Sequence, residues 1–337
     1  MSDSGRRRTV IILGLVAVAA CAWATARRFA RPTATPLTQV SAIPENVTQT
    51  DSVWYWLERP AKAKTRLVRV ANSKSETIAE ADEIAGYSVS GDKISWSDRI
   101  DKTWRVMSGP LSRQKAQIWS GTDTAGRPCF DGNRVLWTTT HAGPLNDISY
   151  LPALGPTTTL YAAEPGGGSS TIVTLSEADA GLLAIQAGTA FVSARRNTVV
   201  YKVGLNDGKY KRIAGEATMY QPVIDKNGTL FWVAGSKDTS NIGLVVSVNS
   251  LPPTGNALTN LDWVPEAGVI YPTAAGNFYI DGTVQPSLWP ITGNDRLPVP
   301  AVLPEGYMPV AAGEHSILLR RANFSRGQQE LFTSPMP

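Results

Sequence analysis

The hexapeptide Gly91-Asp92-Lys93-Ile94-Ser95-Trp96 joins a tight turn to a short strand of alternating polar and apolar side chains that ends in tryptophan. Glycine next to aspartate favours the turns that connect antiparallel strands. The same arrangement recurs along the 337-residue chain, and the aromatic residues that end these strands are 40, 41, 95 and 39 positions apart: Trp56, Trp96, Trp137, Trp232 and Tyr271. The chain is therefore built from repeats of about 40 residues.

Two further units complete the set. The interval of 95 residues contains Gly188–Arg196 (GTAFVSARR), and Gly313–Arg321 (GEHSILLRR) follows the last aromatic residue of the series. Short strands at this density, without an amphipathic helix after residue 31, predict an all-β fold. A period near 40 with four strands per unit predicts a β-propeller of seven blades, each of four antiparallel strands. Six or eight blades remain an alternative, because the spacing is least regular between Trp137 and Gly188.

The pattern also predicts details of single blades. We expect blade three to take its third strand from residues 147–153 and its fourth from residues 157–163. In blade six we expect a fourth strand near Leu288–Ile291, which the nearby prolines restrict to an edge position. The chain ends before the last unit has a fourth strand. We therefore expect a strand from residues 36–48 to complete this blade, which would leave no open edge. We expect the repeated tryptophans to pack between blades and not to form a platform for sugars.

Two units resemble the repeats of bacterial TolB-like and related propellers. In these repeats an Asp-Gly or Asn-Gly turn opens a strand that ends in an aromatic or small residue, as in residues 131–137 (DGNRVLW) and 225–232 (DKNGTLFW). The Trp-Asp dipeptide of WD repeats is absent from the units. The resemblance implies a propeller that is exported and that binds a protein partner.

The N-terminus carries a signal for membrane insertion. Three arginines at 6–8 precede an uncharged run, Thr9–Ala26, and arginines follow it at 27, 28 and 31. Its 18 residues would form a helix of about 27 Å, long enough for a bilayer core. The favoured interpretation is a single-pass anchor with the first arginines held inside. The alternatives are a cleaved secretory signal and a lipoprotein signal whose acylated residue is Cys21.

These observations divide the chain into a membrane anchor or signal segment at 1–31, a Pro/Thr-rich linker at 32–50 that can donate a closing strand, and a propeller domain at 51–337. The formal charge is +4 for the whole chain and +5 for residues 1–31, which leaves −1 for the remainder. A folded part that is close to neutral argues against nucleic acid as a partner. We expect the propeller to lie outside the cytoplasm, facing the bacterial periplasm or the cell exterior; lipoprotein and secreted forms are the alternatives.

The sequence contains none of the common catalytic or nucleotide-binding motifs, and with two histidines it predicts no catalytic residues, no metal site and no cofactor. Binding residues on propellers lie mostly on loops. The connection between second and third strands shares a rim with the connection between blades, and it is there that we expect ligand contacts from His141, Asp147 and Asp123. The insert at 164–180 is expected on the same rim.

Two functions follow from this pattern. The first is a membrane-tethered extracytoplasmic propeller that binds a protein or glycan partner on its loop rim, as a scaffold at the cell envelope. The alternative is an exported enzyme, a glycan lyase, hydrolase or cyclase, with carboxylates at the mouth of the channel. Convergence of Asp123, Asp131, Asp147 and His141 would favour the enzyme, whereas scattered acids would favour binding.

Overall fold

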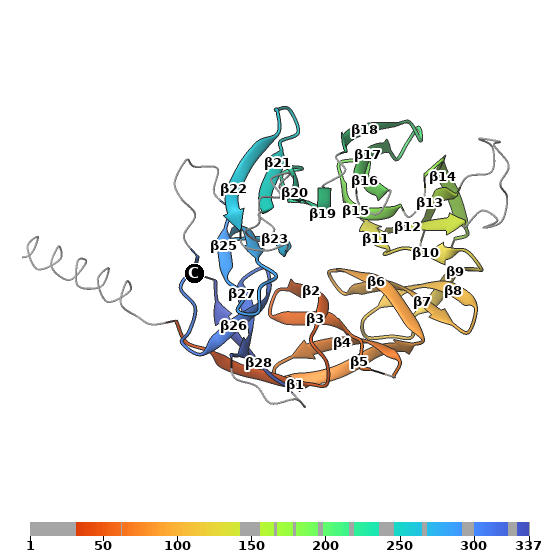
Figure 1. The fold of residues 1–337 in the computed structure, drawn as a ribbon. Coiled ribbons are helices and arrows are strands. Elements are labelled where there is room, and N and C mark those ends of the chain that lie inside the picture. Colours follow the sequence, from red (N-terminus) through yellow and green to blue (C-terminus); the bar gives the residue numbers. More distant parts are fainter. Residues whose placement is uncertain are drawn as a thin grey trace, which may run out of the picture.

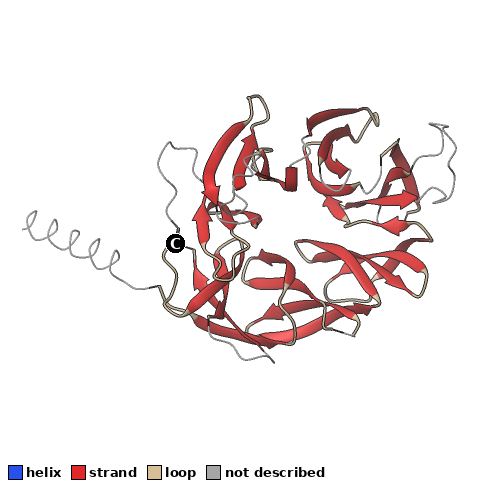
Figure 2. Cartoon of the chain, in the orientation of Figure 1, coloured by secondary structure: helices blue, strands red, loops and turns tan. Residues whose placement is uncertain are grey.

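The computed structural model describes residues 32–61, 63–141, 156–164, 167–177, 180–194, 198–215, 219–235, 246–264, 268–291, 300–322 and 329–336. In this part of the chain every regular element is a β-strand, and Figure 2 shows strands joined by loops. The strands form seven antiparallel sheets arranged in a ring, the seven blades of a β-propeller (Figure 1). The predicted fold class and blade number are therefore confirmed.

The first four blades follow the chain order, each running from its innermost to its outermost strand. Blade one contains β2 (Glu45–Thr50), β3 (Val53–Glu58), β4 (Thr65–Ala71) and β5 (Lys74–Ala81). Blade two contains β6 (Glu83–Ser90), β7 (Lys93–Ile100), β8 (Thr103–Pro110) and β9 (Ala116–Gly121). Blade three has a divided first strand and contains β10 (Thr124–Ala125), β11 (Cys129–Asp131), β12 (Arg134–His141), β13 (Thr157–Ala163) and β14 (Ser169–Leu175). Blade four contains β15 (Gly181–Gln186), β16 (Thr189–Ala194), β17 (Val199–Gly204) and β18 (Tyr210–Gly215).

The last three blades close the ring. Blade five contains β19 (Met219–Ile224), β20 (Leu230–Gly235), β21 (Val246–Leu251) and β22 (Leu258–Val264). The described part of blade six contains β23 (Val269–Thr273), β24 (Gly276–Ile280) and β25 (Leu288–Pro290). Blade seven contains β26 (Tyr307–Ala312), β27 (Ser316–Arg321), β28 (Gln329–Pro335) and, outermost, β1 (Thr35–Val40).

The strand from the N-terminal segment closes the propeller as predicted. β1 pairs antiparallel with β28, with Val40 opposite Gln329 and Thr35 opposite Thr333. The innermost strand of blade one, β2, follows directly. The propeller thus begins at β1 and not at residue 51, and the segment 32–50, expected mainly as a linker, supplies two strands. Pairing of the two ends of the chain leaves no open edge between the first and last blades.

Four strand assignments differ from the expected ones. Tyr271, expected to end a second strand, lies in β23, the innermost strand of blade six. Residues 157–163 form the third strand of blade three, because they pair along the whole of β12, and β14 is the fourth strand. The segment 147–153 lies outside the described residues. In blade six, β25 is the third strand and pairs with β24. Residues 169–175, part of the expected insert, form β14, so the preceding Gly167–Gly168 turn lies between third and fourth strands.

The core is divided among the interfaces between blades. Each of the seven apolar clusters combines side chains from two neighbouring blades. The second strand of a blade is buried on both faces: in β3, Trp54 and Trp56 pack toward blade seven while Tyr55 and Leu57 pack toward blade two. The repeated tryptophans are buried in these clusters, as expected: Trp56, Trp96, Trp137 and Trp232. Burial of these large side chains contributes to the hydrophobic stabilisation of the interfaces between blades.

Candidate functional site

The propeller has two chemically different rims. Because neighbouring strands in a blade are antiparallel, the connections from second to third strand and from each blade to the next lie on one rim, here called rim A. The turns from first to second strand and from third to fourth strand lie on the opposite rim, rim B. β1 begins on rim B, where β28 also ends. Both ends of the described chain therefore lie on rim B.

The structure brings together two of the three residues predicted as ligand contacts. Asp123 lies directly before β10 and His141 ends β12, so both are on rim A. The imidazole Nδ1 of His141 lies 2.9 Å from Asp123 Oδ1, and the His141 side chain is 64% exposed. The third residue, Asp147, lies outside the described residues.

The same kind of contact occurs in the two preceding blades. In blade one, Arg59 after β3 donates to Glu45 at the start of β2, at 2.8 Å. In blade two, the backbone N–H of Asp101 donates to Asp82 Oδ2 at 2.8 Å. An acid at the start of the first strand thus joins the connection between second and third strands in all three blades. The Asp123–His141 contact therefore has counterparts at the same place in blades one and two.

The acids around blade three do not converge. Asp131 pairs with Arg134 at the beginning of β12, whereas His141 is the last residue of the same strand. Seven residue steps along an extended strand separate the two ends by about 23 Å. Among the described residues, there is no group of three His, Cys, Asp or Glu side chains that could hold a metal ion. Asp131 and the Asp123–His141 pair therefore do not share one site.

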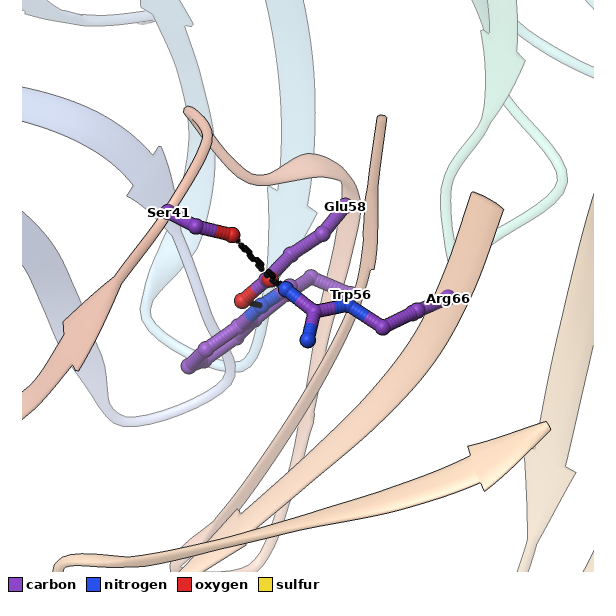
Figure 3. A network of polar contacts seen from close by, with 4 residues as sticks. All are labelled: Ser41, Trp56, Glu58 and Arg66. Atoms are coloured by element: carbon purple, nitrogen blue, oxygen red, sulfur yellow. Dashed lines mark hydrogen bonds and ion pairs between the residues drawn. The ribbon is translucent and has the colours of Figure 1, made fainter. Parts of the chain in front are cut away.

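A second polar arrangement is structural. In blade one, Glu58 accepts hydrogen bonds from the Trp56 indole N–H at 3.1 Å, from Arg66 at 2.6 Å and from Ser41 at 3.3 Å (Figure 3). Blade two repeats it with Trp96, Asp98 and Arg105. These carboxylates are buried and fully occupied by partners, so they tie second and third strands together and are not available to a ligand.

A cavity with a volume of about 1040 Å³ occupies the central channel. The innermost strands of six blades contribute to its wall, and blade three contributes Arg127, which lies between β10 and β11. Two cations on the wall, Arg127 and Lys226, form no ion pair with a described carboxylate, whereas Glu45 is paired with Arg59. Burial raises the pKa of the Tyr271 hydroxyl in the wall to about 12. The sequence analysis did not predict the channel residues. Arg127 and Gln221 both precede a proline, but Asn46 precedes a valine, so no single sequence pattern identifies all three.

Exposed apolar side chains concentrate on rim A. Of the eight large apolar side chains that are exposed in the described part of the chain, six lie on this rim: Ile43, Ile100, Tyr220, Val269, Val284 and Val302. They belong to the consecutive blades five, six, seven, one and two. Val284 and Val302 are 92% and 75% exposed. The other two, Tyr210 and Leu258, begin outer strands at rim B. Rim A therefore carries most of the exposed large apolar side chains of the described residues.

No protein-family model matches the sequence, and no curated protein matches it either. Solved structures do resemble it. An acylaminoacyl peptidase in complex with Z-Gly-Gly-Phe-chloromethyl ketone aligns with a TM-score of 0.61 and 12% identity, over 87% of this chain and 51% of the peptidase. Virginiamycin B lyase from Staphylococcus aureus aligns with a TM-score of 0.60 and 8% identity, over 91% of this chain and 99% of the lyase.

TolB from Acinetobacter baumannii also aligns, with a TM-score of 0.49 and 13% identity, over 84% of this chain and 63% of TolB. The chain spans about half the length of the peptidase it matches. At these identities the likeness concerns the fold. The protein is a seven-bladed β-propeller, and the propeller fold expected from its repeats is confirmed.

The N-terminal predictions concern residues that the structure does not describe. The apolar run at 9–26 and Cys21 both lie in the undescribed segment 1–31. Within the described residues, no helix has the length and apolar character needed to cross a bilayer.

Proposed function

We propose that this protein is a membrane-tethered extracytoplasmic β-propeller that binds a protein partner through rim A and so acts as a scaffold at the cell envelope. The observation that carries the proposal is the concentration of exposed apolar side chains on rim A, on consecutive blades. Isolated aliphatic side chains such as Val284 and Val302 offer desolvation to a protein surface but no stacking face for a sugar. The partner is therefore a protein and not a glycan.

The position of the chain ends supports the tethered arrangement. β1 begins on rim B, so an anchor at residues 9–26 reaches the propeller on that side. The nine residue steps from Ala26 to Thr35 span at most about 30 Å when extended, which keeps rim B near the bilayer. Rim A then faces away from the membrane and is accessible to a partner in the same compartment.

The enzyme alternative has no comparable support. Asp131 lies at the opposite end of β12 from the Asp123–His141 pair, and that pair repeats a contact made in blades one and two. The peptidase and lyase activities named for two similar structures belong to those proteins.

The test is the composition of complexes extracted with mild detergent from membranes that contain the full-length chain. We expect the wild-type chain to elute with a second, different protein in fixed proportion. A charge at an apolar position on rim A should dissociate the complex. Val302→Glu and Val284→Glu should therefore each leave the propeller without its partner. The matched control is Leu258→Glu, at an apolar position on rim B with 54% exposure, which should retain the partner.

Circular dichroism establishes that each variant is folded. A wild-type chain that elutes alone would contradict the proposal. So would a particle that contains only copies of this chain, or equal loss of the partner in the Leu258→Glu control.

A further inference from the structure

The central channel carries a ring of three polar side chains at one level. Asn46 lies in a β-bulge of β2 opposite Trp56, between the pairs Glu45–Leu57 and Thr48–Tyr55. Gln221 occupies the same place in β19, opposite Trp232, between the pairs Tyr220–Val233 and Val223–Phe231. Arg127 lies in the interruption between β10 and β11, opposite Trp137. All three line the channel and are exposed to it.

The backbone holds these side chains in an unusual way. Asn46 and Gln221 have positive φ values of 50° and 45°. Glutamine seldom adopts this conformation, and such residues persist where the surrounding structure imposes them, often at binding sites. In blade two, Gly86 leaves room for Arg127, because a Cβ at that position would lie 2.8 Å from the Arg127 Cβ.

The donors of Arg127 are only partly used. Its Nε donates to the carbonyl oxygen of Tyr87 at 3.0 Å, which fixes the guanidinium at the wall. No described residue accepts a hydrogen bond from its two terminal nitrogens, and no described carboxylate forms an ion pair with it. A guanidinium in this state offers two parallel N–H donors, the geometry that matches a carboxylate.

The wall changes character one residue further from rim A. The next positions on the innermost strands are apolar in blades one, four and seven, where Val47, Leu183 and Val310 are partly buried against the clusters between blades and line the channel. Ile270, at the corresponding position of blade six, is 2% exposed and belongs to such a cluster. The channel thus presents a cation and two carboxamides near rim A and an apolar collar deeper inside. A ligand that matches it carries a carboxylate and an amide beside an apolar group.

We propose that the channel binds the carboxyl end of a peptide whose last residue is apolar. Arg127 binds the terminal carboxylate through its two free nitrogens, Asn46 and Gln221 form hydrogen bonds with the last amide, and the apolar side chain enters the collar. This site borders the rim A surface at Val269, and it does not depend on the membrane tether.

The test uses N-acetyl-Ala-Ala-Leu as the probe, with calorimetric titration into the full-length protein. Three ligands are compared: the free acid, its C-terminal amide, and octanoate, which has a carboxylate but no peptide group. We expect the free acid to bind at least about tenfold more tightly than the amide, because a fork of two charge-assisted hydrogen bonds is lost. Octanoate should bind more weakly than the free acid; equal binding would assign the site to fatty acids and overturn the peptide proposal.

Two variants and a control locate the binding. Arg127→Met should abolish the preference for the acid, whereas Arg113→Met, at an exposed arginine in the turn after β8, should keep it. Gln221→Glu is nearly isosteric and adds a negative charge at the ring, so it should weaken binding of the acid and leave the amide unaffected. It also keeps the test decisive if the Arg127 variant does not fold. Equal affinities for acid and amide in the wild-type protein, no binding at millimolar concentrations, or the same loss in Arg113→Met would overturn the proposal.

Discussion

Asp98 and Arg105 face each other across β7 and β8 and form two hydrogen bonds. Arg105 donates from Nε to Asp98 Oδ1 at 2.8 Å and from Nη2 to Asp98 Oδ2 at 2.9 Å. The carboxylate is 2% exposed and the guanidinium side chain 27%. Asp98 also accepts the indole N–H of Trp96 at 2.7 Å. The buried charge is therefore stable only while its partners are in place.

Replacement of this carboxylate should be costly. Asp98→Asn leaves Arg105 without a counter-charge in a mostly buried position, so we expect the free energy of unfolding to fall by about 3 kcal/mol. Urea denaturation measures this loss in the free energy of unfolding. The control is Glu76→Gln in the exposed pair with Arg69, which should cost less than about 1 kcal/mol. Equal losses in the two variants would contradict the structural role of the buried pair.

The contact between the first and last blades gives a second prediction. Gln49 in β2 donates to Ser316 Oγ at 2.8 Å and accepts from the backbone N–H groups of His315 and Ser316 at 3.0 and 3.2 Å. Gln49→Ala should lower the free energy of unfolding by about 2 kcal/mol, because partly buried donors lose their acceptor. Gln117→Ala, on the exposed face of β9, should change it by less than about 0.5 kcal/mol. A Gln49 variant as stable as the Gln117 variant would show that this contact does not hold the ring closed.

Two buried tryptophans should respond differently to the same change. The indole N–H of Trp96 has Asp98 as acceptor, whereas that of Trp137 has no acceptor among the described residues, because Thr139 stands where blades one and two have an acid. Both changes to phenylalanine remove similar apolar volume. We therefore expect Trp96→Phe to cost about 1 kcal/mol more than Trp137→Phe in thermal or urea unfolding. The opposite order would indicate that the indole hydrogen bond is not stabilising.

Alkaline pH should destabilise the propeller through its buried phenols. Burial raises the pKa of Tyr271 to about 12 from the ordinary value of 10, and it raises the pKa of Tyr87 as well. The unfolded chain then releases protons at lower pH than the folded one, so the free energy of unfolding falls as the pH rises from 10 toward 12. Urea unfolding at several alkaline pH values should show this fall, with a smaller slope for Tyr271→Phe. An unchanged slope in the variant would mean that burial does not raise the pKa of Tyr271.

The fold could be predicted from the sequence because each repeat contains its own turn residues and its own strand pattern. Turn residues such as Gly91-Asp92 and tryptophans such as Trp96 and Trp232 mark a second strand that is buried on both faces, and their spacing sets the blade number. The closing strand followed from the missing fourth strand of the last unit.

The prediction for the third strand of blade three was wrong, because the composition of residues 147–153 is also typical of a strand. The structure pairs 157–163 with β12 instead. Composition alone could not choose between two adjacent β-like segments.

The candidate sites were predicted only in part. Asp123 and His141 could be placed on one rim from strand parity, and the structure confirms their contact. The ring of Asn46, Arg127 and Gln221 was not predicted, because the sequence does not show that β2 and β19 each contain a bulge or that the first strand of blade three is divided. The three residues precede the repeated tryptophans by 10, 10 and 11 positions, but this spacing alone does not show which side chains line the channel.

The central claim is that the propeller stands outside the membrane with rim A directed away from it. The most direct measurement is the labelling of single introduced cysteines by a membrane-impermeant maleimide in spheroplasts that carry the full-length chain. The parent, whose Cys129 is buried, provides the background. We expect Val284→Cys on rim A to be labelled equally with and without detergent, and Ser52→Cys, in the rim B turn after β2, to be labelled without detergent but more slowly. Labelling of both cysteines only after detergent would place the propeller on the other side of the membrane and contradict the account.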